Sequence, residues 1–230
     1  MQKINNEQIE ELYAFTRNHF VEYYDLQTEL VDHLANDIEA MWEKQPELNF
    51  EDAKNAAFKK FGVFGFLEPI EQKQKAMGRR YRGFLWNEFK AWFTLPKVVF
   101  TLLIFVIFYA AFSSVYVKYF SITFYLGIAI WSIYRTIQLN RIFRRRKEKS
   151  NKKWMMEEMI FKQAGGTLLV FMSQIHTFYN LSESFTLNAY TVAGLATVFT
   201  ILFLVSYISF QLLPEKAEEL LNKTYPEYAL

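Results

Sequence analysis

The sequence predicts an all-α protein in which a small cytosolic helical domain precedes a four-helix transmembrane bundle. Two observations lead to this prediction: four long windows without a charged residue, and apolar residues at helical spacing in the acidic first third of the 230-residue chain. No stretch alternates apolar and polar residues as a half-buried strand does. The apolar share of 52% is close to that of a globular chain, so the distribution of these residues is what indicates a membrane protein.

The first domain is predicted to span residues 1–76, where 8 basic and 15 acidic side chains give a net charge of −7. Asn5 and Asn6 are suited to cap a first helix, because the acids that follow them favour a helix N-terminus. Between residues 24 and 43, apolar residues recur every three or four positions. They predict one buried stripe, which comprises Leu26, Leu30, Leu34, Ile38 and Met41.

A shorter helix is predicted after Asn49, which is the expected N-cap, and Gly62 is expected to follow its end. The buried face of this helix is predicted to comprise Ala53, Ala56, Ala57 and Phe61. Pro69 is expected in the first turn of the next helix, which leads into residues 77–97. We expect residues 77–97 to form a basic, aromatic juxtamembrane helix.

The transmembrane domain is predicted to occupy residues 98–214. A bilayer core about 30 Å thick needs roughly 20 apolar helical residues. The second window reaches this length through Leu139 if Arg135 extends its guanidinium toward the lipid headgroups. A buried soluble core is the alternative, and four such windows with basic flanks argue against it. The uncharged windows cover residues 98–117, 119–134, 163–182 and 184–214.

The distribution of lysine and arginine predicts the orientation of these spans. Residues 135–153 are expected to form a basic cytosolic loop, with 9 basic residues and 1 acidic residue. The other two connections offer only Lys118 and Glu183. Because basic loops stay on the cytoplasmic side, we expect a multi-pass protein of the bacterial inner membrane. Both termini, including a tail of residues 215–230, are then cytoplasmic.

Two strings in the first domain carry a family resemblance: Glu29-Leu-Val-Asp32-His33-Leu34 in one helix, and Phe50-Glu-Asp-Ala53 with Phe61-Gly62 in the next. Their order resembles the HAAS-type signalling domain and is similar to the prefix domain of some ABC-type permeases. The resemblance covers about residues 8–76. It implies a helical domain ahead of transmembrane segments, whose gene often neighbours that of a PadR-type transcriptional regulator.

One insert departs from the pattern of that family. Members usually continue from the Phe-Gly end of the helix into an Asp-Pro or Ser-Pro turn. Here the apolar stretch Val63-Phe64-Gly65-Phe66-Leu67 comes first. We expect this insert to dock on the membrane or on the helical bundle.

Two sets of polar residues are weak candidates for chemistry. Glu29, His33 and Asp37 are spaced to share one helical face, which is compatible with a metal or proton site. A solvated acidic face is the favoured alternative, because no second histidine pair is visible. His176 lies inside the third apolar window, where a proton relay or ligand contact competes with hydrogen bonding between helices.

The strongest charge feature is the basic cluster inside residues 135–153. We expect it to bind anionic phospholipid headgroups, or to dock the acidic first domain, which would compete with lipid for it. A purely topogenic role is the alternative, and no nucleic acid partner is expected. The cluster comprises Arg141, Arg144, Arg145, Arg146, Lys147, Lys149, Lys152 and Lys153.

The sequence favours a regulatory or sensory protein over an enzyme. Cysteine is absent, which excludes thiol catalysis and cysteine-bound metals, and we expect no catalytic residues and no cofactor. The leading hypothesis is a protein that relays a membrane or envelope state through its cytosolic domain to an unidentified protein partner. An accessory subunit of a membrane transporter is the alternative, and a membrane-embedded enzyme ranks third. Small residues in the third and fourth windows favour close packing of helices within the chain, and a homodimer is the alternative.

Overall fold

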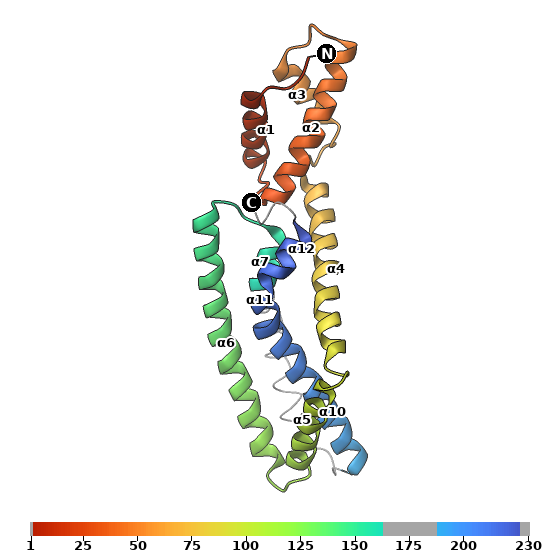
Figure 1. Ribbon diagram of the computed structural model, residues 1–230, viewed down its shortest axis with the longest axis vertical. Helices are drawn as coiled ribbons and strands as arrows, with labels where there is room; N and C mark the ends of the chain where they lie inside the picture. Colours follow the sequence, from red (N-terminus) through yellow and green to blue (C-terminus); the bar gives the residue numbers. More distant parts are fainter. Residues whose placement is uncertain (1, 163–187, 226–230) are drawn as a thin grey trace. The chain divides into compact units, whose positions relative to one another are not determined.

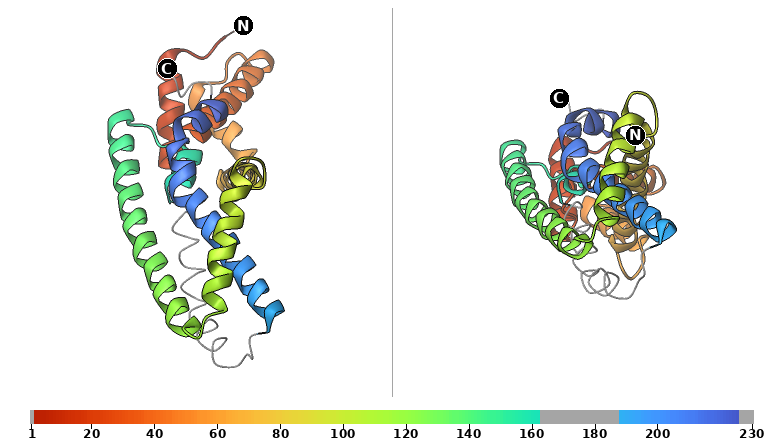
Figure 2. Two further views of the ribbon diagram at one scale, coloured as in Figure 1. Left: turned by 60° about the horizontal axis from the view of Figure 1, so that its bottom comes forward. Right: turned by 90° about the horizontal axis from the view of Figure 1, so that it is seen from below.

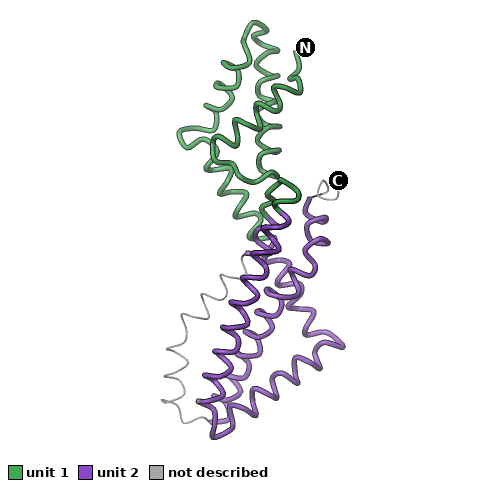
Figure 3. The backbone as a smooth tube through the Cα atoms, turned by 90° about the vertical axis from the view of Figure 1, so that its left-hand side faces the viewer, with its two compact units in different colours: residues 1–79, 147–155 green, residues 80–146, 156–230 purple. Residues whose placement is uncertain are grey.

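The computed structural model describes residues 2–162 and 188–225. Within them, every regular element is a helix, which confirms the predicted all-α class. The chain divides into two compact units, residues Met1–Arg79 with Lys147–Met155, and residues Arg80–Arg146 with Met156–Leu230 (Figure 3). The first unit therefore contains part of the basic region as well as the predicted helical domain.

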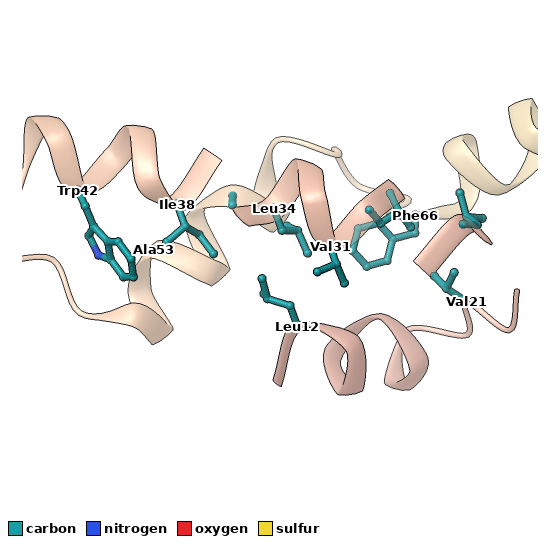
Figure 4. Close-up of a cluster of buried hydrophobic side chains, with 11 residues drawn as sticks. Leu12, Val21, Val31, Leu34, Ile38, Trp42, Ala53 and Phe66 are labelled. Carbon is teal, nitrogen blue, oxygen red and sulfur yellow. The ribbon is translucent and has the colours of Figure 1, made fainter. Parts of the chain in front are cut away.

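Four helices contribute to the first unit: α1 (Asn6–Asn18), α2 (Tyr24–Lys44), α3 (Phe50–Lys59) and the start of α4 (Leu67–Ala91) (Figure 1). The stripe predicted on α2 faces their common core, where Leu34 and Ile38 are fully buried. Leu12 of α1, Ala53 of α3 and Phe66 meet this stripe (Figure 4). Such a core holds the short helices α1 and α3 in place, because isolated helices of 13 and 10 residues are at best marginally stable in water.

The predicted helix caps are present. Asn5 and Gln8 form a capping box, in which Asn5 Oδ1 accepts from the Gln8 N–H at 2.8 Å and Gln8 Oε1 accepts from the Asn5 N–H at 3.0 Å. Asn49 caps α3 and accepts from the Asp52 N–H at 2.8 Å. These bonds satisfy N–H groups that have no partner within the helix.

The buried face of α3 differs from the prediction, and Phe61 follows the end of the helix and is only half-buried. Ala56 is exposed, whereas Lys54 is buried. The Lys54 ammonium forms ion pairs with Glu11 of α1 and, at 2.7 Å, with Glu51. A buried lysine is tolerated here because both carboxylates accept its hydrogens.

The apolar insert after α3 forms a tight turn. Gly62 and Gly65 adopt φ values of 78° and 53°, a left-handed conformation that glycine tolerates best. The turn directs Phe66 into the core of the first unit, where it is 2% exposed. Phe66 therefore packs on the helical domain itself, while Val63 and Phe64 stay exposed.

The structure bears out two of the four predicted spans. Among the described residues, two helices are long and apolar enough to cross a membrane, Tyr119–Ser150 and Ala189–Glu215. The first window instead gives α5 (Lys97–Phe112), a shorter apolar helix. Helix α5 ends at Phe112, and in its last turn Ser113 Oγ donates to the Tyr109 carbonyl at 2.8 Å. The third window, residues 163–182, lies outside the described residues.

Apolar side chains cover the outside of these helices. Only 17% of the apolar window of α6 (Val117–Ser150) and 39% of that of the second span-length helix are buried. Large residues such as Leu103, Ile130 and Ile201 are exposed by 57%, 68% and 40%. In a water-soluble protein these helices would bury such faces, so their pattern suits a lipid environment.

The helices α5 and α10 (Ala189–Tyr207) pack side by side (Figure 2). Their contact is aromatic: the rings of Phe112 and Phe199 lie 4.8 Å apart, and Phe124 of α6 approaches Phe108 at 4.9 Å. Ala196 is fully buried at this contact, and its small side chain permits the close approach.

The region predicted as a basic loop is mostly helical. Helix α6 continues without a break to Ser150. The reason is compositional, since lysine and arginine are good helix formers and are favoured near a helix C-terminus. The helix ends at Ser150, and the next residue, Asn151, adopts the left-handed φ of 51°.

The expected solvation of Arg135 is also corrected. Rather than extending alone to headgroups, its guanidinium donates to the carbonyl of Phe210, through Nε at 3.2 Å and Nη2 at 2.8 Å. Phe210 lies in η1 (Ile208–Leu212), a π-helical turn that follows α10. Arg135 also donates to the side chain of Gln138.

Three short helices complete the second unit: α7 (Met155–Lys162), α11 (Leu213–Glu215) and α12 (Ala217–Thr224). Met156, Ile160 and Leu221 are fully buried there. The Arg146 guanidinium donates to Glu157 at 2.8 Å, and the Glu157 side chain is only 2% exposed.

Candidate functional site at the contact of the helical domain with residues 152–155

The start of α2 is bound to the segment that follows α6. We call the contact between residues 22–25 and residues 152–155 the docking contact. The Tyr24 N–H donates to the Lys153 carbonyl at 2.8 Å. Asp25 Oδ1 accepts from the Met155 N–H at 3.3 Å. One backbone–backbone bond and one bond from a backbone N–H to a side-chain carboxylate thus join two separated parts of the sequence. Both satisfy backbone groups that would otherwise need other partners.

Side chains reinforce the docking contact. The Lys153 ammonium lies 2.5 Å from Glu22 and 4.5 Å from the ring centre of Tyr23. The Lys152 ammonium lies 4.2 Å from the ring centre of Tyr24. Both distances are typical of cation–π interactions.

Trp154 is the apolar centre of this contact. Its ring meets that of Tyr24 edge-on at 5.2 Å, and the residue is only 4% exposed. The residue lies inside the first unit, where its burial stabilises the contact.

A cleft of about 740 Å³ adjoins the docking contact, and we call it the cationic cleft. Four cations and one carboxylate line it, together with polar groups of both segments. Glu22, the carboxylate, is paired with Lys153. The lining residues are Arg17, Val21, Glu22, Tyr24, Gln27, Lys147, Ser150, Asn151, Lys152 and Lys153.

The predicted basic cluster is therefore divided among different surroundings. Lys147, Lys152 and Lys153 line the cationic cleft, whereas Arg141, Arg145 and Lys149 are exposed and do not line it. Arg144 is also exposed. Arg146 is engaged in the second unit with Glu157 and, at 3.4 Å, with Glu218. Arg146 thus has a structural role, and the anion-binding role of the cluster stays a prediction.

The candidates Glu29, His33 and Asp37 do not form a metal site. Glu29 pairs with Lys73 at 2.7 Å and Asp37 with Lys60 at 2.8 Å. Glu29 and His33 line a groove of about 590 Å³ between α2 and α4, in which Asp37 takes no part. Among the described residues, no group of three or more metal-binding side chains is gathered. His176 lies outside the described residues.

Sequence reasoning missed three residues of this site. Arg17 and Gln27 line the cleft, and Asp25 binds the start of α7 although it is almost buried. The pairing of Asp25 with a residue 130 positions away follows from tertiary structure. In the sequence, Asp25 is equally well explained as an acid that stabilises the first turn of α2. No local signal therefore pointed to its contact with Met155.

Comparison of the chain with protein-family models, curated proteins and solved structures gives no match. The resemblance to the HAAS-type domain therefore stays an expectation from the sequence.

Proposed function

We propose that this chain is a regulatory or sensory protein of the bacterial inner membrane, whose helical domain relays the state of the membrane to a protein partner. The docking contact is the observation that carries the proposal. It fixes the start of α2 to the residues directly after α6, a helix long and apolar enough to cross a membrane. A change in the position of α6 would therefore reach the helical domain through a short segment.

The four-span topology is part of this proposal. Helices α6 and α10 supply two spans, and the window of residues 163–182 supplies another. Helix α5 is about 24 Å long at 1.5 Å per residue, somewhat short of the bilayer core. Local thinning of the bilayer accommodates such a mismatch. Anionic headgroups are the proposed lipid partners of the exposed Arg141, Arg144 and Arg145 on α6.

The test is whether the docking contact responds to the membrane. The chain has no cysteine, so cysteines introduced at the exposed positions Asn36 and Lys149 can be labelled specifically with spin labels. We expect the distance distribution between them to change when the full-length protein is moved between bilayers of different thickness. The variant Asp25→Ala should already show the released distribution in every bilayer. A distribution that is the same in all bilayers would favour a passive accessory subunit over a sensor.

A further inference from the structure

We infer that the cationic cleft binds a phosphate group, and that this group bridges the helical domain and the end of α6. The inference rests on the proposed function only in its use of the docking contact. It names a ligand for that contact. It also reverses the expectation from the sequence, in which anionic lipid and the helical domain compete for the basic segment of residues 135–153.

The charges of the cleft are not balanced by protein. Arg17 lies in the last turn of α1, Lys147 in the last turn of α6, and Lys152 in the segment that follows α6. No described carboxylate forms an ion pair with any of these three cations. Their mutual repulsion is the cost of folding them around one cleft, and an anion would remove it.

Helix dipoles do not offset this charge. The C-termini of α1 and α6 contribute roughly half a negative charge each, and the N-terminus of α2 about half a positive charge. Three unpaired unit charges therefore dominate the field in the cleft. A solute that enters the cleft is exposed to this field. Salt screens the field less inside a cleft than at a flat surface.

The polar lining suits phosphate oxygens. Asn151 presents an amide at the turn that ends α6, and Arg17 offers a planar fork of donors. A volume of about 740 Å³ exceeds that of inorganic phosphate and leaves room for a phosphate-bearing headgroup. The shared chemistry is the phosphate group, whether it belongs to a lipid or to a soluble ester.

The position of the cations determines the effect of binding. Arg17 belongs to the helical domain, whereas Lys147 and Lys152 belong to the basic segment. An anion held by both sides binds the docked form more tightly than the released form. It must therefore shift the equilibrium toward the docked form.

The experiment uses the full-length protein labelled at Asn36→Cys and Lys149→Cys, in nanodiscs of phosphatidylcholine at constant ionic strength. One arm adds inorganic phosphate, and the other replaces part of the lipid with phosphatidylglycerol. We expect a narrower distance distribution in at least one arm, and the responding arm identifies the source of the phosphate. Chloride at the same ionic strength should have no such effect.

Two variants and a control assign the effect to the cleft. Arg17→Gln and Lys152→Gln should each weaken the response to the anion by about tenfold, the loss of one charge-assisted hydrogen bond. Lys59→Gln removes an exposed cation of the same domain that does not line the cleft, and it should leave the response unchanged.

Two results would overturn the inference. The first is a broader distribution in the presence of phosphate, which would show competition. The second is an equal response of Lys59→Gln and the cleft variants, which would show general screening. Either result leaves the proposed function standing if bilayer thickness still changes the docking contact.

Discussion

Arg135 of α6 donates two hydrogen bonds to the backbone carbonyl of Phe210 in η1. In a regular α-helix, the N–H of residue 214 would bind this carbonyl, but residue 214 is proline and has no N–H. The proline ring also crowds the carbonyl four residues earlier, which accounts for the π-helical turn at this position. The arginine thus substitutes for the donor that the proline removes, and it links two span-length helices of the second unit.

This relationship predicts that a change at residue 214 restores stability lost by a change at residue 135. Arg135→Leu should destabilise the second unit by about 1–3 kcal/mol, because it leaves the Phe210 carbonyl without this donor. Adding Pro214→Ala should recover much of the loss, because it restores an N–H at residue 214. Thermal unfolding of the two single variants and the double variant in detergent measures the coupling. Additive effects would show that the carbonyl does not connect the two residues.

Leu34 is fully buried in the core of the first unit. Leu34→Ala should therefore destabilise this unit by about 2–5 kcal/mol through lost burial and a cavity. Hydrogen exchange of the α2 amides in the full-length protein reports this change locally. Val63→Ala, at a position 98% exposed, is the control and should leave the exchange rates unchanged. Similar rates in both variants would mean that the core is misassigned.

The Lys54 cluster predicts a dependence on pH. The hydrogen bond from the Lys54 ammonium lowers the pKa of Glu51 below its ordinary value of 4.5. This stabilisation is present above pH 4.5 and is lost as the pH falls through the lowered pKa.

Lys54 determines how the stability of this cluster depends on pH in the alkaline range. Burial alone would lower its pKa, but its hydrogen bonds to Glu11 and Glu51 raise it above 10.5, so its contribution is lost only at high pH. Lys54→Met should flatten the loss of stability in acid, while Lys59→Met on the same helix should retain it. Unfolding midpoints between pH 3 and pH 7, by circular dichroism, provide the measurement. Equal acid sensitivity of both variants would contradict the prediction.

The orientation of α6 is open to a direct test. Ser114 lies in the turn between α5 and α6, just before α6 begins. Lys149 lies at the other end, in the last turn of α6. We expect an impermeant thiol reagent to label Ser114→Cys on intact spheroplasts, and Lys149→Cys only after the membrane is opened. The reverse labelling pattern would place the basic end of α6 on the outer side of the membrane.

Local signals in the sequence predicted part of this structure and tertiary contacts decided the rest. Asn5 and Asn49 were predicted as caps because a cap depends on the few residues beside it. The core stripe around Leu34 followed from helical periodicity. Burial of Lys54 could not be predicted, since it depends on Glu11, which is 43 positions away.

The candidate site shows the same division. The basic cluster was visible as a run of charges, but its separation into Arg146, which binds Glu157, and Lys152, which faces the cleft, depends on how the chain folds back. The run of basic residues also suggested a loop, although its helical propensity favours continuation of α6. Uncharged windows likewise located apolar segments without fixing where each helix ends: the first window runs to residue 117, whereas α5 ends at Phe112.

The unbroken course of α6 has a mechanical consequence. At 1.5 Å per residue its 34 residues form a rod about 51 Å long, with no proline and with its single glycine, Gly127, near the middle of its apolar part. If α6 crosses the bilayer as proposed, a small change of its tilt, such as a thinner bilayer imposes, moves the ends of the helix farther than its middle. Lys147 and Ser150 lie in its last turn.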